Sequence, residues 1–168
     1  DEEGSRIYQA WVDGLGTSDN GAQVGYVESP FAEQTIVHSG RQSMPLTYGN
    51  LGGIAVSEAR REWSEVQDWT LHDLKTLTLY VRGQTTNDPM PLYVTIVDDA
   101  GRSATVVDAE ANVATTATWQ EWTVPFSALT PVDLTRVKTM VIGLGDRANA
   151  VGGMGLVYID DIRLEAAR

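Results

Sequence analysis

Hydrophobic and polar residues alternate through most of the chain, which indicates β-strands rather than helices. In "LKTLTLYVRG", Leu77, Leu79 and Val81 fall on one strand face, while Tyr80 falls on the other. The segment "LYVTIVDDAGRSATVVD" contains two such runs joined by a polar turn, which is typical of a β-hairpin. The remaining runs are RIYQAWV, AQVGYVES, QTIVHSG, QSMPLTYG, GIAVSEARREW, WQEWTVPF, VKTMVIGLG and GLVYIDDIRL.

Short polar turns, many with one of the 16 glycines, separate these runs. No segment shows an apolar period of 3.6 residues with helix caps, although "SALTPVDLTRV" has room for one short helical turn. About ten short strands at this spacing predict an all-β fold. We expect a two-sheet antiparallel β-sandwich of the jelly-roll type, with a closed barrel as the competing architecture.

Length and charge indicate the number of domains and exclude some classes of partner. A chain of 168 residues without an internal repeat or low-complexity linker is predicted to form one domain, residues 1–168. The 23 acidic residues exceed the 12 basic ones, giving a net charge of -11, and no Lys/Arg cluster offsets this field. Because such a field repels phosphate, we expect no nucleic-acid partner. No apolar run reaches the length of a membrane span, so no membrane partner is expected.

Catalytic signals are weak. The absence of cysteine excludes disulfides, thiol catalysis and Cys-ligated zinc. His38 and His72 have no metal-ligand spacing, and no Gly-x-Ser-x-Gly elbow is present. The loop "GLGDRANAVGGMG" resembles a phosphate-binding loop, but a strand follows it instead of the helix N-terminus that would hold phosphate. Since the sequence singles out no carboxylate pair, a glycan-active hydrolase or lyase is the least favoured class.

Five motifs in order resemble the galactose-binding-like jelly rolls that make up many bacterial carbohydrate-binding modules. They are VHSGRQSMPL, DWTLHDLKTLTLYVRG, LYVTIVDDAG, TWQEWTVPFSAL and VYIDDIRL, and together they span residues 37–164. The region before Val37 departs from the family, because it lacks the Phe-Glu pair usual in the first strand. The resemblance implies a secreted or cell-surface bacterial domain, linked to other domains. The abrupt start, "DEEGSR", agrees with a domain excised from a longer protein.

The resemblance also implies a structural Ca²⁺. In such domains an Asp of the last strand ligates the ion together with backbone carbonyls of the "HSGK"-like turn. Carried over, Asp160 is the carboxylate ligand, and the carbonyls near Ser39 and Arg41 are its partners. A further acidic ligand would come from Asp1, Glu2 or Glu3.

Alternation separates the two adjacent aspartates of the last strand. Asp160 shares a face with Tyr158, Ile162 and Leu164, so we expect it to point inward, where a hard cation would stabilise its charge. Asp161 falls on the opposite face and is expected to be solvated. The alternative without a metal is that Asp160 accepts hydrogen bonds from backbone amides or pairs with an arginine.

Aromatic composition points to sugar recognition. Five Trp and six Tyr against two Phe favour rings with a polar edge, which stack on pyranose faces while neighbouring polar groups bind the hydroxyls. The competing interpretation is structural: Trp122 is expected in the core, and Trp69 and Trp119 are expected to be structural residues at strand entries.

Polar-face residues of the predicted strands are the candidate ligand contacts. If their strands are neighbours, they form a shallow face for a neutral polysaccharide or oligosaccharide; they are Tyr80, Arg82, Tyr93, Glu58 and Arg60. A second set would line an edge site made by loops, and consists of Trp11, Asp13, Tyr26 and Tyr48.

The sequence therefore favours a non-catalytic glycan-binding module that brings an attached enzyme or surface protein to polysaccharide. The leading alternative is a structural or protein-interaction β-sandwich without a sugar site.

Overall fold

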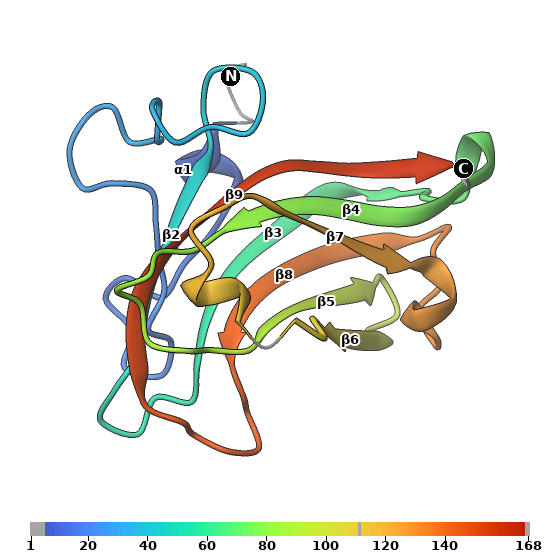
Figure 1. The fold of residues 1–168 in the computed structure, drawn as a ribbon. Coiled ribbons are helices and arrows are strands. Elements are labelled where there is room, and N and C mark those ends of the chain that lie inside the picture. The colour runs from blue at the N-terminus through green and yellow to red at the C-terminus, as the bar shows by residue number, and fades with distance from the viewer. Residues whose placement is uncertain (1–5, 111, 167–168) are drawn as a thin grey trace.

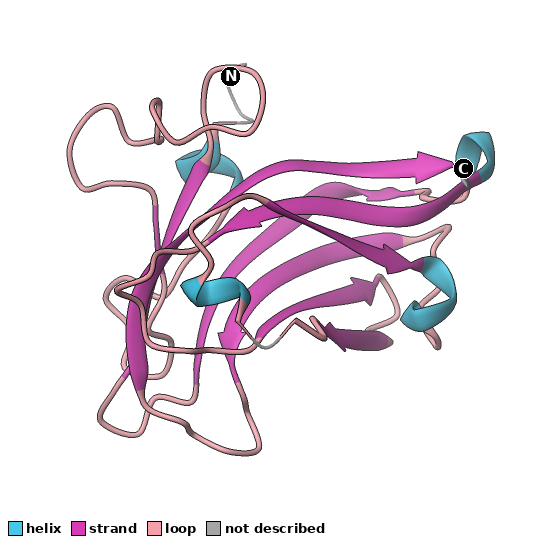
Figure 2. Cartoon of the chain, in the orientation of Figure 1, coloured by secondary structure: helices cyan, strands magenta, loops and turns pink. Residues whose placement is uncertain are grey.

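The computed structural model describes residues 6–110 and 112–166 and shows two antiparallel β-sheets packed face to face (Figure 1). The strands are β1 Gln23–Val24, β2 Met44–Asn50, β3 Val56–Gln67, β4 Leu74–Arg82, β5 Leu92–Asp98, β6 Ser103–Val107, β7 Gln120–Pro125, β8 Val137–Gly145 and β9 Gly153–Ala166. The helices are one short α-helix, α1 Ile7–Ala10, and the 3₁₀ turns η1 Leu71–Asp73, η2 Val113–Thr115 and η3 Phe126–Leu129. Figure 2 shows these helices outside the sheets, in the connections.

The strands form a five-stranded sheet in the order β1-β2-β9-β4-β7 and a four-stranded sheet in the order β3-β8-β5-β6. Every strand pairing is antiparallel. The predicted all-β sandwich is confirmed, with nine strands in the described residues rather than about ten. The two sheets do not close on each other, so the barrel alternative is wrong.

Alternating side chains of both sheets fill the space between them. Leu79 and Val157 from the five-stranded sheet and Ile96 and Ile142 from the four-stranded sheet are all fully buried. Burial of apolar surface stabilises the fold by about 25 cal/mol per Å². Because one face of each strand is committed to this core, the opposite faces are left for solvent or ligands.

The residues before β2 depart from the predicted strands. The run RIYQAWV contains α1 instead of a strand, AQVGYVES contributes only β1, and QTIVHSG forms no strand. Trp11 is buried in the core, and the next residue, Val12, pairs with Arg60 of β3 in an isolated bridge. Packing of Trp11 and one cross-strand contact therefore override the local alternation.

The predicted strands QSMPLTYG and GIAVSEARREW are confirmed as β2 and β3, and the six predicted strands from residue 74 onward as β4 to β9. In the described part of the chain, no helix has the length and apolar character needed to cross a membrane.

Candidate functional site

The outer face of the four-stranded sheet carries residues from all four strands in register. One row across the sheet consists of Glu58 on β3, Gly143 on β8, Tyr93 on β5 and Val107 on β6. The Tyr93 ring occupies the space beside Gly143 that any other residue's side chain would fill, because a Cβ at this position would lie 2.3 Å from the ring. The ring therefore lies across β8, and its hydroxyl donates a hydrogen bond to Glu58.

The Tyr93 side chain is held in place, and its phenol is neutral. Its side chain is buried, and burial together with the bond to Glu58 raises the pKa of the phenol far above its usual value. It therefore keeps its proton and holds the Glu58 carboxylate in place.

The next row along the same face consists of Arg60, Val141, Thr95 and Thr105. The two threonine hydroxyls lie 2.7 Å apart and bond to each other. Two hollows of about 350 and 410 Å³ lie over these rows, and Thr95 and Arg147 line both. Because they share these residues, we call the two adjoining hollows together the groove; its main residues are Asp13, Asn20, Glu58, Arg60, Tyr93, Thr95, Val97, Thr105, Val107, Val141 and Arg147.

Arg147 forms one rim of the groove. It lies in the loop between β8 and β9, and its Nη2 donates to Glu58 Oε2 at 2.5 Å. Partial burial opposes the charge of Arg147, but the hydrogen bond and attraction of Glu58 outweigh this and raise its pKa. The Arg147 side chain is 70% exposed and Glu58 only 15%, so the carboxylate is the anchor and the guanidinium is accessible.

A loop before β1 also borders the groove beside β3. Asn20 binds the backbone of Glu58 twice: its Nδ2 donates to the carbonyl at 2.9 Å, and its Oδ1 accepts from the amide at 2.8 Å. Asp13 accepts the Val24 N–H at 2.7 Å. These bonds hold the loop that contains Asp13 and Asn20 along the edge of the groove.

Four residues of the two predicted ligand sets come together in the groove: Glu58, Arg60, Tyr93 and Asp13. The prediction that Tyr80 and Arg82 join them is wrong, because β4 belongs to the other sheet. Alternation fixes which face of a strand is polar, but it does not decide which strands are neighbours.

The structure does not bring the other three predicted edge-site residues into the groove. Trp11 and Tyr48 are buried core residues, and the Tyr48 hydroxyl donates to the Asp88 carbonyl at 2.5 Å. Tyr26 donates to Glu33 and lies outside the groove. This bond joins two residues of the loop between β1 and β2.

Several groove residues were not among the predicted ligand contacts. Thr95 follows Tyr93 by two residues, and Thr105 lies on its hairpin partner, so strand alternation contained the signal for both. Arg147 and Asn20 lie in loops and reach the groove only through contacts with β3. No pattern along the chain indicates those contacts.

The predicted orientations of the two aspartates in β9 are wrong. The core-facing residues are Val157 and Ile159, so Asp160 lies on the outer face of the five-stranded sheet. Its Oδ2 accepts the backbone N–H groups of His38 at 2.8 Å and Ser39 at 3.3 Å, and Oδ1 accepts the N–H of Asp161 at 2.8 Å.

Asp161 is not a solvated side chain. It has a φ of 47°, and the pairing of β9 with β4 shifts register around it, so it belongs to a β-bulge. Its carboxylate accepts from Ser39 Oγ at 2.7 Å and contacts His38 Nδ1 at 2.6 Å. Burial raises the pKa of this carboxyl, but the bonds from Ser39 and His38 outweigh burial and hold the pKa below its usual value.

The surroundings of Asp160 do not fit a calcium ion. Ca²⁺ requires six to eight oxygen ligands, whereas Asp160 meets three N–H donors. Ser39 supplies its N–H to Asp160, and Arg41 is exposed. Among the described residues no group of three His, Cys, Asp or Glu side chains is placed to hold a metal; Asp1, Glu2 and Glu3 lie outside the described residues. No observation tests calcium binding itself, so the predicted ion stays a prediction, although these donors do not favour it.

Aromatic rings complete this contact between the 34–43 segment and the five-stranded sheet. The His38 ring stacks on Tyr80 with centroids 3.6 Å apart, and Trp119 meets His38 edge-on at 5.7 Å. The Tyr80 hydroxyl donates to Glu121 at 2.8 Å. Tyr80 thus helps hold a loop against the sheet.

No protein-family model matches the chain, and no curated protein sequence matches it either. Its fold is similar to that of solved structures. An exo-beta-agarase is 11% identical with a TM-score of 0.69; the match covers 99% of this chain and 25% of the agarase. A family 30 carbohydrate-binding module is 13% identical with a TM-score of 0.62, and the match covers 94% of this chain and 99% of the module.

A family 11 carbohydrate-binding module from Clostridium thermocellum, solved with a β-1,3-1,4-mixed-linked tetrasaccharide, is 11% identical with a TM-score of 0.53. That match covers 94% of this chain and 95% of the module. The chain therefore has the β-sandwich fold of carbohydrate-binding modules over nearly its whole length, and it spans about a quarter of the agarase it matches.

Proposed function

We propose that this protein is a non-catalytic glycan-binding module and that the groove on its four-stranded sheet holds the glycan. The groove carries the proposal, because its polar groups are fixed before any ligand arrives: Arg147 and Tyr93 are both bonded to Glu58. Such preorganisation reduces the entropy lost on binding. The similarity of fold to carbohydrate-binding modules supports the same function.

The chemistry of the groove suits hydroxyl groups. Arg60 and Arg147 supply N–H donors, and the Thr95 and Thr105 hydroxyls both donate and accept. Val141, Val97 and Val107 lie among them and offer apolar contacts to the C–H faces of a sugar ring. Among the described lining residues Tyr93 is the one aromatic, and it is buried, so we infer recognition mainly through hydrogen bonds.

The charges of the groove favour a neutral glycan. Arg147 is paired with Glu58, and Arg60 donates to Glu62 at 3.1 Å, while Asp13 adds a further carboxylate. No excess positive charge remains for a uronate or sulfate chain. The net charge of -11 repels such polyanions over a longer range.

We further propose that the module belongs to a longer, secreted bacterial protein. The fold recurs within agarase chains about four times the length of this one, which supports linkage to a catalytic domain. A module that holds polysaccharide raises the effective concentration of substrate for such a neighbour. The described residues contain no candidate transmembrane helix, and an extracellular location fits a polysaccharide ligand.

Isothermal titration calorimetry and affinity electrophoresis against agarose, mixed-linkage β-glucan and cellulose test the proposal. We expect Arg147→Ala and Arg60→Ala to weaken binding of the retained glycan about tenfold each. Arg82→Ala is the matched control, because Arg82 lies on the other sheet and should leave affinity unchanged. Equal loss in all three variants, or no binding to any glycan, would contradict the assignment.

Binding of a protein partner, with no glycan retained, would instead indicate an interaction domain. Release of reducing ends from any of these glycans would contradict a non-catalytic role.

A further inference from the structure

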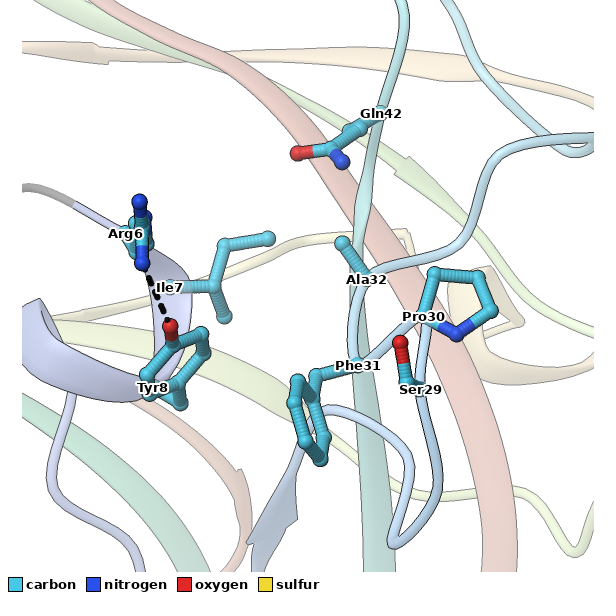
Figure 3. Close-up of a pocket in the computed structure, with 8 residues that line it drawn as sticks. All are labelled: Arg6, Ile7, Tyr8, Ser29, Pro30, Phe31, Ala32 and Gln42. Atoms are coloured by element: carbon cyan, nitrogen blue, oxygen red, sulfur yellow. Dashed lines mark hydrogen bonds between the residues drawn. The ribbon is translucent and has the colours of Figure 1, made fainter. Parts of the chain in front are cut away.

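A separate cleft lies between α1 and the loop at residues 29–32 (Figure 3). Its volume is about 290 Å³. We call it the aromatic cleft; its main lining residues are Arg6, Tyr8, Ser29, Pro30, Phe31 and Gln42. None of these residues lines the groove.

Two rings are exposed in this cleft. Tyr8 is 48% and Phe31 43% exposed, and their centroids lie 5.3 Å apart with the ring planes at 59°. The other phenylalanine, Phe126, packs against the core. A single exposed ring needs no explanation, but two adjoining exposed rings in one cleft offer a ligand two apolar surfaces tilted toward each other.

The Tyr8 ring is held in position by its neighbour in the chain. The Tyr8 hydroxyl accepts a hydrogen bond from Arg6 Nη1 at 3.1 Å (Figure 3). In the same helix Ile7 is partly buried and packs against the core, which anchors α1. Both contacts limit the freedom of the ring before a ligand binds.

The Phe31 ring is held by the backbone of its own loop. The Tyr26 N–H donates to the Phe31 carbonyl at 2.7 Å, and the adjacent Ala32 is buried. Glu33 and Ser43 then exchange two backbone hydrogen bonds of 3.1 and 3.0 Å. The loop is therefore closed on itself directly beside the ring.

Polar groups surround the two rings. The guanidinium of Arg6, the hydroxyl of Ser29 and the side-chain amide of Gln42 supply donors and acceptors at the rim. Aromatic faces bordered by such groups match a pyranose, which has an apolar C–H face and a ring of equatorial hydroxyls.

We propose that the aromatic cleft is a second glycan-contact site, where a sugar residue of a neutral polysaccharide stacks on one of the two rings and contacts the other. This inference rests on the proposed function. The cleft supplies the stacking that the groove lacks, since the groove offers hydrogen bonds and a buried ring. Together the two sites would hold a polymer more tightly than either alone.

The chain brings the two sites near each other. Tyr8 precedes Val12 by four residues, and Val12 pairs with Arg60 at the edge of the groove. Four residues span no more than roughly 14 Å, so the Cα atom of Tyr8 lies within that distance of the groove edge. One polysaccharide chain is therefore long enough to contact both sites.

Affinity electrophoresis in soluble β-1,3-1,4-glucan and in low-melting agarose tests the second site. We expect Phe31→Ala and Tyr8→Ala each to weaken retention about three- to tenfold, and Phe31→Tyr to retain it. Val27→Ala is the matched control, because Val27 lies in the same loop, is 78% exposed and does not line the cleft. Thermal melting curves show whether each variant is folded.

The outcomes separate the two proposals. If Arg147→Ala weakens binding but Phe31→Ala and Tyr8→Ala do not, the groove stands and the aromatic cleft is overturned. If the cleft variants alone weaken binding, the cleft is supported and the groove is not the glycan site. If wild-type protein binds none of glucan, agarose and cellulose, both proposals are overturned. Equal loss in Val27→Ala would also overturn the cleft, since a general loop effect would then explain it.

Discussion

At the scale of single residues, Gly143 shapes the groove by what it lacks. Tyr93 and Glu58 flank it on the neighbouring strands, and the Tyr93 ring crosses the space that a side chain would fill. Because the ring crosses β8, the Tyr93 hydroxyl reaches Glu58. The same Glu58 carboxylate pairs with Arg147.

Gly143→Ala is therefore expected to destabilise the fold by about 1–3 kcal/mol, because the added methyl overlaps the buried Tyr93 ring. Urea unfolding measures the loss. Gly49→Ala serves as the control, since a Cβ at Gly49 meets nothing nearer than 3.7 Å. Similar losses in both variants would contradict the steric explanation.

Asp161 contributes stability that depends on pH. Ser39 and His38 hold the pKa of this carboxyl below its usual value of about 3.9. The stabilisation is therefore fully present above that value and is lost as pH falls through the lower pKa of the folded state.

Asp161→Asn keeps a residue type that tolerates the positive φ but removes the charge. We expect it to lower the free energy of unfolding by about 1–2 kcal/mol at pH 7, with the difference from wild type shrinking below about pH 4. Urea titrations at both pH values provide the measurement. A difference that grows at low pH would contradict the assigned direction.

At the scale of elements, the bulge in β9 decides what the aspartate pair does. It turns both carboxylates toward the 38–39 turn, where N–H and hydroxyl groups bind them. The last strand thereby fixes the segment that precedes β2.

This arrangement sharpens the test for calcium. If the ion binds through Asp160, EDTA should lower the melting temperature of wild type but not of Asp160→Ala. The observed N–H donors instead predict that EDTA has no effect and that Asp160→Ala lowers the melting temperature by itself. Differential scanning calorimetry in EDTA and in added CaCl₂ distinguishes the two.

At the scale of the whole molecule, the net negative charge favours neutral ligands over polyanions. The net charge is -11, and the arginines of the groove are paired with carboxylates. Association with a polyanion would be opposed at low ionic strength and would strengthen as salt screens the repulsion.

We therefore expect the affinity for a neutral glycan to change less than about twofold between 50 and 500 mM NaCl. Alginate should not be retained in either condition. Affinity electrophoresis with added salt measures both, and strong retention of alginate at low salt would contradict the proposed neutral ligand.

The sequence by itself determined the fold class and the strands from β2 to β9, because alternation is a local consequence of burying one strand face. It also identified Glu58, Arg60 and Tyr93 as residues of a polar face. Only the tertiary structure decided which faces meet. It separated Tyr80 from Tyr93, brought Arg147 to Glu58 from a distant loop, and turned Asp160 outward. Sheet order and loop contacts join residues far apart in the chain, and no local periodicity records such contacts.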